Sequence, residues 1–329
     1  MLTVSIINKR STEETGIPLV LFIFKILKMS IIESQPLLAP LSERTADIPA
    51  LPAVMIEPLV RATLLEDLGR AGDLTSDAII PAQATVKLKL AARQQGVLAG
   101  LDLARAAFRV MDPDVAVSIV REDGARLSPG DEIAVIHGNA RAMLGAERTA
   151  LNFLCHLSGI ASATASIADA IRSYGTRVSC TRKTAPGLRA VQKYAVRVGG
   201  GSNHRYGLDD AVLIKDNHIV VAGSVSEAVR RARAFVGHMV RIQLEVDTLE
   251  QLEEALATGV EAVLLDNMSP EMLREAVRMA GGKVITEASG RITAQTAPEI
   301  AATGVDLIAV GWITHSAPVL DIGLDADHG

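Results

Sequence analysis

The sequence predicts an α/β protein with two domains, and three observations support this fold class. The chain has 329 residues, which is typical of two domains of about 100–200 residues each. Its hydrophobic content is 49% but only 3% is aromatic, which suits buried parallel strands covered by helices. In the second half, short apolar runs alternate with helical segments, as in parallel β/α units.

Residues 51–140 have the pattern of an α+β domain with an antiparallel sheet. Residues 58–68 follow a helical period that stops at a glycine, and the alternating run at 85–92 predicts a half-exposed strand. Residues 101–111 predict a second helix. Residues 115–138 predict two or three strands joined by glycine and proline turns.

An alanine-rich segment from Arg141 to about residue 173 predicts a bridging helix, interrupted at Ser158 and Gly159. After it, strand and helix patterns repeat every ~20–25 residues, which predicts a barrel or a doubly wound sheet. Six strands are clear, so an eight-stranded barrel does not follow from the pattern alone. The predicted strands lie within residues 176–181, 211–217, 241–247, 262–268, 284–290 and 307–313.

Residues 1–50 predict a loose N-terminal extension. The apolar run from Ile17 to Met29 is shorter than the ~20 residues that a membrane helix needs, and Lys25 interrupts it. No small-residue cleavage site follows closely, which argues against export. We expect no membrane association, and we interpret residues 1–28 as an upstream extension before a start at Met29.

Charge and cysteine content narrow the class of protein. The net charge is −5, with 33 basic and 38 acidic residues interspersed, so no broad cationic surface for nucleic acid is expected. The only cysteines, Cys155 and Cys180, cannot form a disulfide framework or a thiolate metal site. They are expected to be small buried residues of a cytoplasmic protein.

Polar residues follow the predicted strands of the second half where each strand ends. The carboxyl ends of barrel strands converge on one mouth, where active sites are found. A single polar residue of this kind could simply face a loop, but six strand ends in register predict a site. These residues are Arg182, Lys183, Lys215, Asp216, Glu245, Asp266, Ser289, Gly290 and Gly311.

The stretch between Cys180 and His218 concentrates positive charge in an otherwise acidic chain, which predicts a ligand with several negative charges. Three of these cations, Arg189, Lys193 and Arg197, have helical spacing and are interpreted as a solvated helix face. The others in this stretch are Arg182, Lys183, His204, Arg205 and Lys215.

Glu245 and Asp266 end successive apolar strands, where a carboxylate is costly unless it is paired with a cation. Such oxygens suit Mg²⁺ held partly through substrate phosphates, although ion pairs with nearby lysines would also explain them. The small residues at 288–290 and 310–316 suit a phosphate site. Phosphoribosyl diphosphate fits the phosphate and magnesium sites, and an acidic acceptor fits the cationic pocket.

Several motifs resemble those of the quinolinate phosphoribosyltransferase family. They occur in the same order from about Leu51 to Leu324. They are EDLGRAGDLT, AERTALNFLCHLSGI, TRKTAPGLR, GGGSNHRYGL, LIKDNH, LEVD, LLDN, EASG and THSAPVLDIGL.

The resemblance implies an N-terminal α/β sandwich at residues 51–150, to which residues 316–329 return, and an incomplete α/β barrel at 151–315. It implies a homodimer with shared active sites, acting on quinolinate and phosphoribosyl diphosphate with Mg²⁺ to give nicotinate mononucleotide, CO₂ and diphosphate.

The family's functional residues map onto this sequence. Lys183, Glu245 and Asp266 are expected to be catalytic, with Glu245 and Asp266 also binding Mg²⁺. Arg148, Arg182, His204, Arg205 and Lys215 are expected to bind quinolinate. Ser289, Gly290, Gly311 and His315 are expected to hold the 5′-phosphate.

The chain departs from the family pattern at Arg291 and Trp312, beside the predicted phosphate loops. Three alternatives remain at this point. A molybdenum-associated relative shares some motifs but usually departs from the KDNH sequence that is intact at 215–218. A Schiff-base aldolase would use Lys183 or Lys215 as nucleophile, but it would leave the acidic pair without a role. A non-catalytic anion sensor would bind but not turn over quinolinate.

Overall fold

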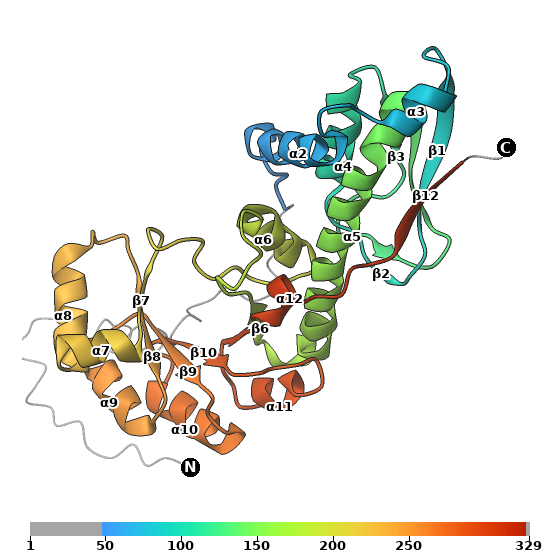
Figure 1. The fold of residues 1–329 in the computed structure, drawn as a ribbon. Coiled ribbons are helices and arrows are strands. Elements are labelled where there is room, and N and C mark those ends of the chain that lie inside the picture. Colours follow the sequence, from blue (N-terminus) through green and yellow to red (C-terminus); the bar gives the residue numbers. More distant parts are fainter. Residues whose placement is uncertain (1–47, 327–329) are drawn as a thin grey trace, which may run out of the picture.

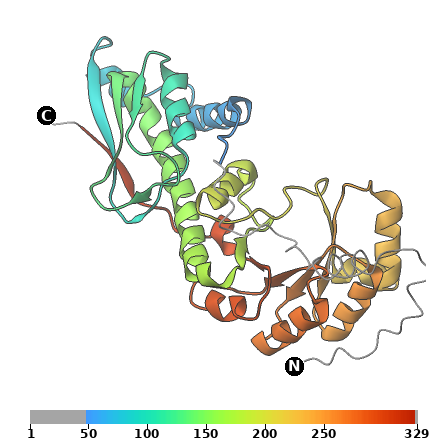
Figure 2. The same ribbon diagram turned by 180° about the vertical axis from the view of Figure 1, so that it is seen from behind.

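The computed structural model describes residues 48–326 and has two lobes, an N-terminal sheet domain and a parallel α/β domain (Figure 1). One long helix, α5 (Ala140–Ala170), runs from the first lobe into the second. Figure 2 shows the same arrangement from behind. The predicted extension at residues 1–50 and the proposed start at Met29 lie almost entirely outside the described residues.

The N-terminal lobe contains an antiparallel sheet, as predicted. Its order is β12-β1-β5-β3, and a two-stranded ribbon, β2-β4, lies apart from it. The strands are β1 (Thr85–Ala92), β2 (Gly96–Val97), β3 (Ala116–Ile119), β4 (Arg126–Leu127), β5 (Glu132–Asn139) and β12 (Ile322–Ala326). The helices are α2 (Ala53–Leu68), α3 (Leu74–Ile79) and α4 (Leu101–Met111).

The last strand, β12, crosses back from the second lobe to the edge of this sheet. It pairs antiparallel with β1, in a register that sets Leu90 opposite Leu324. The alternation in β1 buries Leu88, Leu90 and Ala92 on one face, as the period of two in TVKLKLAA predicts. Both ends of the described chain therefore belong to one lobe.

The second lobe is an incomplete α/β barrel, as the resemblance implies. Its six strands are all parallel, in the order β6-β11-β10-β9-β8-β7, and β6 and β7 remain as edges. All six predicted strands are present. They are β6 (Arg177–Ser179), β7 (Val212–Ile214), β8 (Ile242–Val246), β9 (Ala262–Asp266), β10 (Ile285–Ser289) and β11 (Leu307–Ala309).

Helices connect these strands and cover the outside of the sheet (Figure 1). Local signals fix their ends. In α9, Thr248 and Gln251 form a capping box, and Gly259 ends the helix in the left-handed region. The helices are α6 (Arg189–Val198), α7 (Asp216–Ala222), α8 (Val225–Phe235), α9 (Leu249–Thr258), α10 (Pro270–Ala280), α11 (Ala297–Ala301) and α12 (Trp312–His315), with a short 3₁₀ turn, η2 (Arg172–Tyr174), after α5.

The predicted interruption at Ser158 and Gly159 is wrong, because α5 is continuous through both residues. Packing explains their presence. The Ser158 hydroxyl contacts the Ala99 backbone, and a Cβ on Gly159 would lie 2.1 Å from the Pro318 carbonyl oxygen. The small residues therefore allow the crossing chain to approach the helix.

The same helix, α5, is the one described helix long and apolar enough to cross a bilayer. Two thirds of its most apolar window is buried inside the protein. Its hydrophobicity is accounted for by packing between the lobes, since Leu154, Leu157 and Ile160 are completely buried.

Candidate active site

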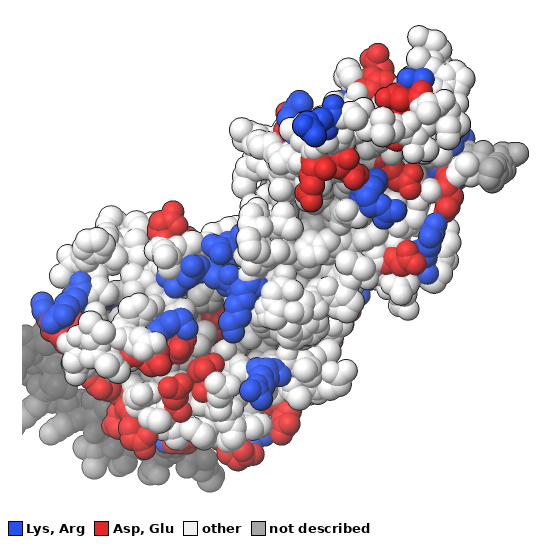
Figure 3. Space-filling model, in the orientation of Figure 1, with Lys and Arg blue, Asp and Glu red and all other residues white. Residues whose placement is uncertain are grey.

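A pocket of about 360 Å³ lies at the carboxyl ends of the barrel strands. It brings together eight of the predicted site residues from five strand ends and the loop before β7. These are Arg182, Lys183, His204, Arg205, Lys215, Glu245, Asp266 and Ser289. Thr181, Leu213, Leu264 and Ala309 complete the lining, and the sequence reasoning had not included them. In Figure 3, lysine and arginine side chains gather over the middle of this lobe with acidic side chains close by.

The parallel register explains why these side chains meet. Ser289 pairs with Asp266 across β10 and β9, and Glu245 pairs with Leu264 across β8 and β9. Strands whose last residues are in register place their terminal side chains at the same edge. The pocket is therefore a direct consequence of polar residues ending apolar strands.

Glu245 is paired with Lys215 across the neighbouring strands. The Lys215 ammonium donates to a Glu245 carboxylate oxygen at 2.6 Å. The Lys215 side chain is 46% exposed and that of Glu245 only 16%. The ion pair offsets the cost of holding the Glu245 carboxylate at a largely buried strand end.

The guanidinium groups of two arginines, Arg182 and Arg205, belong to side chains that line this pocket. The buried Nε atom of each has no hydrogen-bond partner among the described residues. Burial lowers the pKa of Arg205, and the nearby charge of Arg182 lowers it further. An anion bound between these two positive groups would relieve their repulsion.

His204 lines the pocket, but both of its ring nitrogens have partners. Nε2 lies 2.7 Å from Gln243 Oε1, and Nδ1 accepts from the Arg205 backbone N–H at 2.9 Å. The Gln243 amide in turn donates to Glu287 at 2.7 Å, which leaves its oxygen to face His204. In this network Nδ1 is an acceptor and Nε2 faces an amide oxygen, so both sides of the ring are fixed in orientation.

The predicted phosphate loops lie beside the pocket. Gly290 has φ +125°, and a Cβ there would come within 2.5 Å of Asn267 Oδ1, so only glycine fits. A Cβ on Gly311 would lie 3.1 Å from Lys183 Cδ and 3.7 Å from His315 Nε2, so these three residues are neighbours. Of this predicted group, Ser289 alone lines the pocket directly.

Of the two departures from the family pattern, Trp312 has a local explanation in the structure. Arg291 adopts a positive φ of 46° and is exposed immediately after Gly290. The indole N–H of Trp312 donates to the Ile292 carbonyl at 2.9 Å, which ties α12 to the loop after β10. Trp312 therefore braces the loop that follows β10.

Arg148 does not line the pocket of its own chain. It is exposed on α5, in the part of that helix that packs in the N-terminal lobe. Every other predicted quinolinate ligand lies on the barrel pocket.

The prediction that Lys193 belongs to a solvated helix face is wrong. Its side chain is completely buried, and its ammonium contacts the loops that carry the pocket residues. Helical spacing with Arg189 and Arg197 was misleading, because Val191, Ala195 and Val196 bury the same helix on both sides of Lys193.

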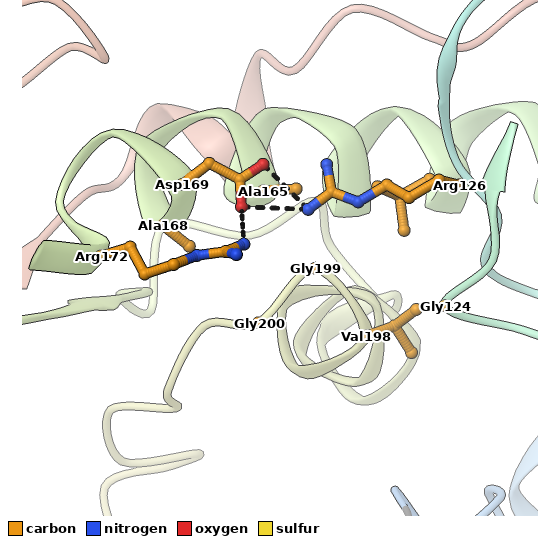
Figure 4. A pocket seen from close by; sticks show the side chains of 10 residues that line it. Gly124, Arg126, Ala165, Ala168, Asp169, Arg172, Val198, Gly199 and Gly200 are labelled. Carbon is orange, nitrogen blue, oxygen red and sulfur yellow. Dashed lines mark hydrogen bonds and ion pairs between the residues drawn. The ribbon is translucent and has the colours of Figure 1, made fainter. Parts of the chain in front are cut away.

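Three larger hollows lie elsewhere, of about 530, 630 and 440 Å³. Figure 4 shows the first, where Asp169 lies between Arg126 and Arg172 and pairs with both. The remaining lining of that hollow is largely apolar or glycine. The charged side chains of this first hollow form ion pairs with one another. We therefore place the site at the barrel mouth, where the predicted site residues gather.

The fold and this pocket define an α/β-barrel enzyme for small, multiply anionic substrates. Residues 73–158 match the family described as quinolinate phosphoribosyl transferase, N-terminal domain, and residues 160–325 match the corresponding C-terminal domain. The chain belongs to the quinolinate phosphoribosyl transferase family.

Individual relatives agree with this assignment over most of the chain. The nicotinate-nucleotide pyrophosphorylase (carboxylating) of Mycobacterium leprae is 45% identical over 274 residues, covering 81% of this chain and 95% of that protein. The probable enzyme of the same name from Bacillus subtilis is 41% identical over 272 residues, covering 83% and 93%. The NadC structure from Streptococcus pyogenes superposes with a TM-score of 0.82 at 40% identity, covering 84% and 98%.

Proposed function

We propose that this protein transfers the phosphoribosyl group of phosphoribosyl diphosphate to quinolinate, releasing diphosphate and CO₂ and forming nicotinate mononucleotide for NAD synthesis. The observation that carries this proposal is the pocket itself, which brings the cationic side chains of Arg182 and Arg205 together with the carboxylates of Glu245 and Asp266. Such a pocket suits an aromatic dicarboxylate on one side and a sugar phosphate on the other.

In this assignment, Arg182, Arg205 and Lys215 bind the two carboxylates of quinolinate. His204, hydrogen-bonded to Gln243 and to the Arg205 backbone, forms the wall of that pocket. Ser289, Gly290 and Gly311 hold the 5′-phosphate, and His315 supports that loop next to Gly311.

Glu245 and Asp266 are proposed to bind Mg²⁺ and the ribose hydroxyls. Among residues 48–326, no group of three or more His, Cys, Asp or Glu side chains could hold a metal ion by itself. Two carboxylates that leave most positions to substrate oxygens fit the way Mg²⁺ is commonly bound. When bound, Mg²⁺ would neutralise charge on the leaving diphosphate.

The chain's own groups would act mainly by position and charge. Arg182 and Arg205 orient quinolinate so that its ring nitrogen faces the anomeric carbon, and that bond forms as the bond to diphosphate breaks. Lys183 places an ammonium near the departing diphosphate, where negative charge increases most. The C2 carboxylate then leaves as CO₂, its bonding electrons remain on C2 beside the cationic ring nitrogen, and C2 takes a proton.

We further propose a homodimer in which Arg148 completes the pocket of the partner subunit. Support comes from its exposed position on α5, outside the pocket of its own chain. An isologous dimer repeats such a contact at both sites. We also propose a cytoplasmic location, because the described thiols, Cys155 and Cys180, are both free.

The test is turnover of quinolinate with phosphoribosyl diphosphate and Mg²⁺, followed by release of CO₂ from carboxyl-labelled quinolinate. The matched control is Arg182→Met, which removes one guanidinium from the pocket. Binding of quinolinate without CO₂ release would support an anion sensor instead.

A further inference from the structure

The ammonium of Lys193 lies in the interior of the barrel lobe, on α6. The side chain is 0% exposed and is among the largest fully buried side chains in the described chain. No carboxylate among the described residues forms an ion pair with it. Burial is the main cause that lowers its pKa.

A buried lysine usually costs stability relative to an apolar side chain of similar size. Here, its donors are directed at groups that flank the pocket. The ammonium donates to the His204 carbonyl oxygen at 2.7 Å and to Cys180 Sγ at 3.2 Å, and it lies 5.0 Å from the centre of the Tyr206 ring.

These three groups belong to two loops that carry the pocket cations. Cys180 directly follows β6 and lies two residues before Arg182, while His204 and Tyr206 flank Arg205 in the sequence. A second set of contacts links the loops: Asn203 Oδ1 lies 3.3 Å from Cys180 Sγ, and its amide donates to the Tyr206 hydroxyl at 2.9 Å. The Lys193 ammonium contacts both loops and so completes this set of polar contacts.

Backbone pairing holds the second loop only as far as residue 202, where Ser202 bridges Ser179 beside β6. Residues 203–211 have no helix or strand. The Lys193 ammonium is therefore a side-chain anchor at the point where backbone pairing ends. It reaches the residue directly before Arg205.

We propose that Lys193 is a positioning residue for quinolinate recognition, which fixes the His204–Arg205 segment against the end of β6. The inference rests on the proposed assignment of Arg205 to quinolinate. Lys193 touches no substrate, so its removal should alter the geometry of the carboxylate pocket and leave the phosphate loops in place.

The experiment compares Lys193→Met with Tyr194→Phe, its neighbour on α6. The Tyr194 hydroxyl donates to Asp123 in the other lobe at 2.8 Å and contacts no pocket residue, so it controls for a lost buried polar contact. Quinolinate binding is measured by calorimetry and both KM values by steady-state kinetics. Wild-type protein that does not bind quinolinate would refute the proposed function, independently of Lys193.

We expect Lys193→Met to weaken quinolinate binding about tenfold or more, with the KM for phosphoribosyl diphosphate within about twofold of wild type. Tyr194→Phe should leave both values unchanged, and Lys193→Arg, which keeps donors and charge, should recover part of the loss. If Lys193→Met does not fold, Tyr206→Leu serves as the second variant, because it removes the exposed ring that contacts the Lys193 ammonium. Unchanged quinolinate affinity, or equal losses for both substrates, would overturn the proposal in either variant.

Discussion

The Lys215 ammonium and the Glu245 carboxylate form an ion pair of 2.6 Å between the adjacent strand ends of β7 and β8. One partner is proposed to bind quinolinate and the other Mg²⁺ and ribose. A quinolinate carboxylate that recruits Lys215 would therefore free the Glu245 oxygens for the second substrate. The pair gives a physical link between the two halves of the pocket.

This link leads to a prediction for Glu245→Gln. The loss of one anionic oxygen should raise the Mg²⁺ concentration for half-maximal rate about tenfold, and Asp266→Asn should act in the same direction. Glu261→Gln is the control, because Glu261 accepts from the Ile242 backbone at the opposite end of β8. An unchanged magnesium response in both site variants would leave these carboxylates as ion-pair partners only.

Lys183→Ala should reduce kcat about 10²–10³-fold while changing quinolinate affinity less than about threefold. The backbone of Lys183 is tied to α12, because the Thr314 hydroxyl donates to its carbonyl oxygen at 2.8 Å. Removal of the side chain should therefore leave the loop in place. Single-turnover experiments measure the rate of the chemical step, and titrations measure quinolinate affinity. Equal losses in the rate and in the affinity would contradict a role of Lys183 toward diphosphate.

Much of the site follows from where polar residues end apolar strands, so Lys215, Glu245, Asp266 and Ser289 could be assigned to one mouth before the fold was known. Two features could not be predicted from the sequence. The burial of Lys193 depends on which face of α6 meets the barrel, and residue spacing alone does not fix that face. The continuity of α5 through Ser158 and Gly159 depends on the chain segment at Pro318, some 160 residues later, which local propensity does not encode.

Arg148 provides a test of the dimer. If it serves the partner's pocket, a dimer of one Arg148→Ala and one Lys183→Ala subunit has one site with both changes and one with neither. Random mixing makes about half of the dimers mixed, so activity should recover to roughly a quarter of wild type. If Arg148 serves its own chain, every site keeps one change, and verified mixed dimers would show no recovery.

His156 predicts a pH dependence of stability. Burial lowers its pKa below the ordinary value of 6.5, and its Nε2 lies 2.8 Å from the Gln192 amide nitrogen. The unfolded chain then binds more protons than the folded chain as the pH falls through 6.5, so stability is lost in that direction. Thermal melts between pH 7.5 and a value about one unit below 6.5 should show a smaller decline for His156→Gln. An identical decline in both proteins would exclude His156 as its source.

The assignment to the quinolinate phosphoribosyl transferase family argues against the aldolase alternative, which would also leave Glu245 and Asp266 without a role. The most direct measurement is the stoichiometry of products from quinolinate labelled at its 2-carboxyl group. With phosphoribosyl diphosphate and Mg²⁺, the account predicts one labelled CO₂ and one diphosphate for each nicotinate mononucleotide formed, with no CO₂ when phosphoribosyl diphosphate is omitted. Diphosphate release without CO₂, or no turnover by folded protein, would contradict it.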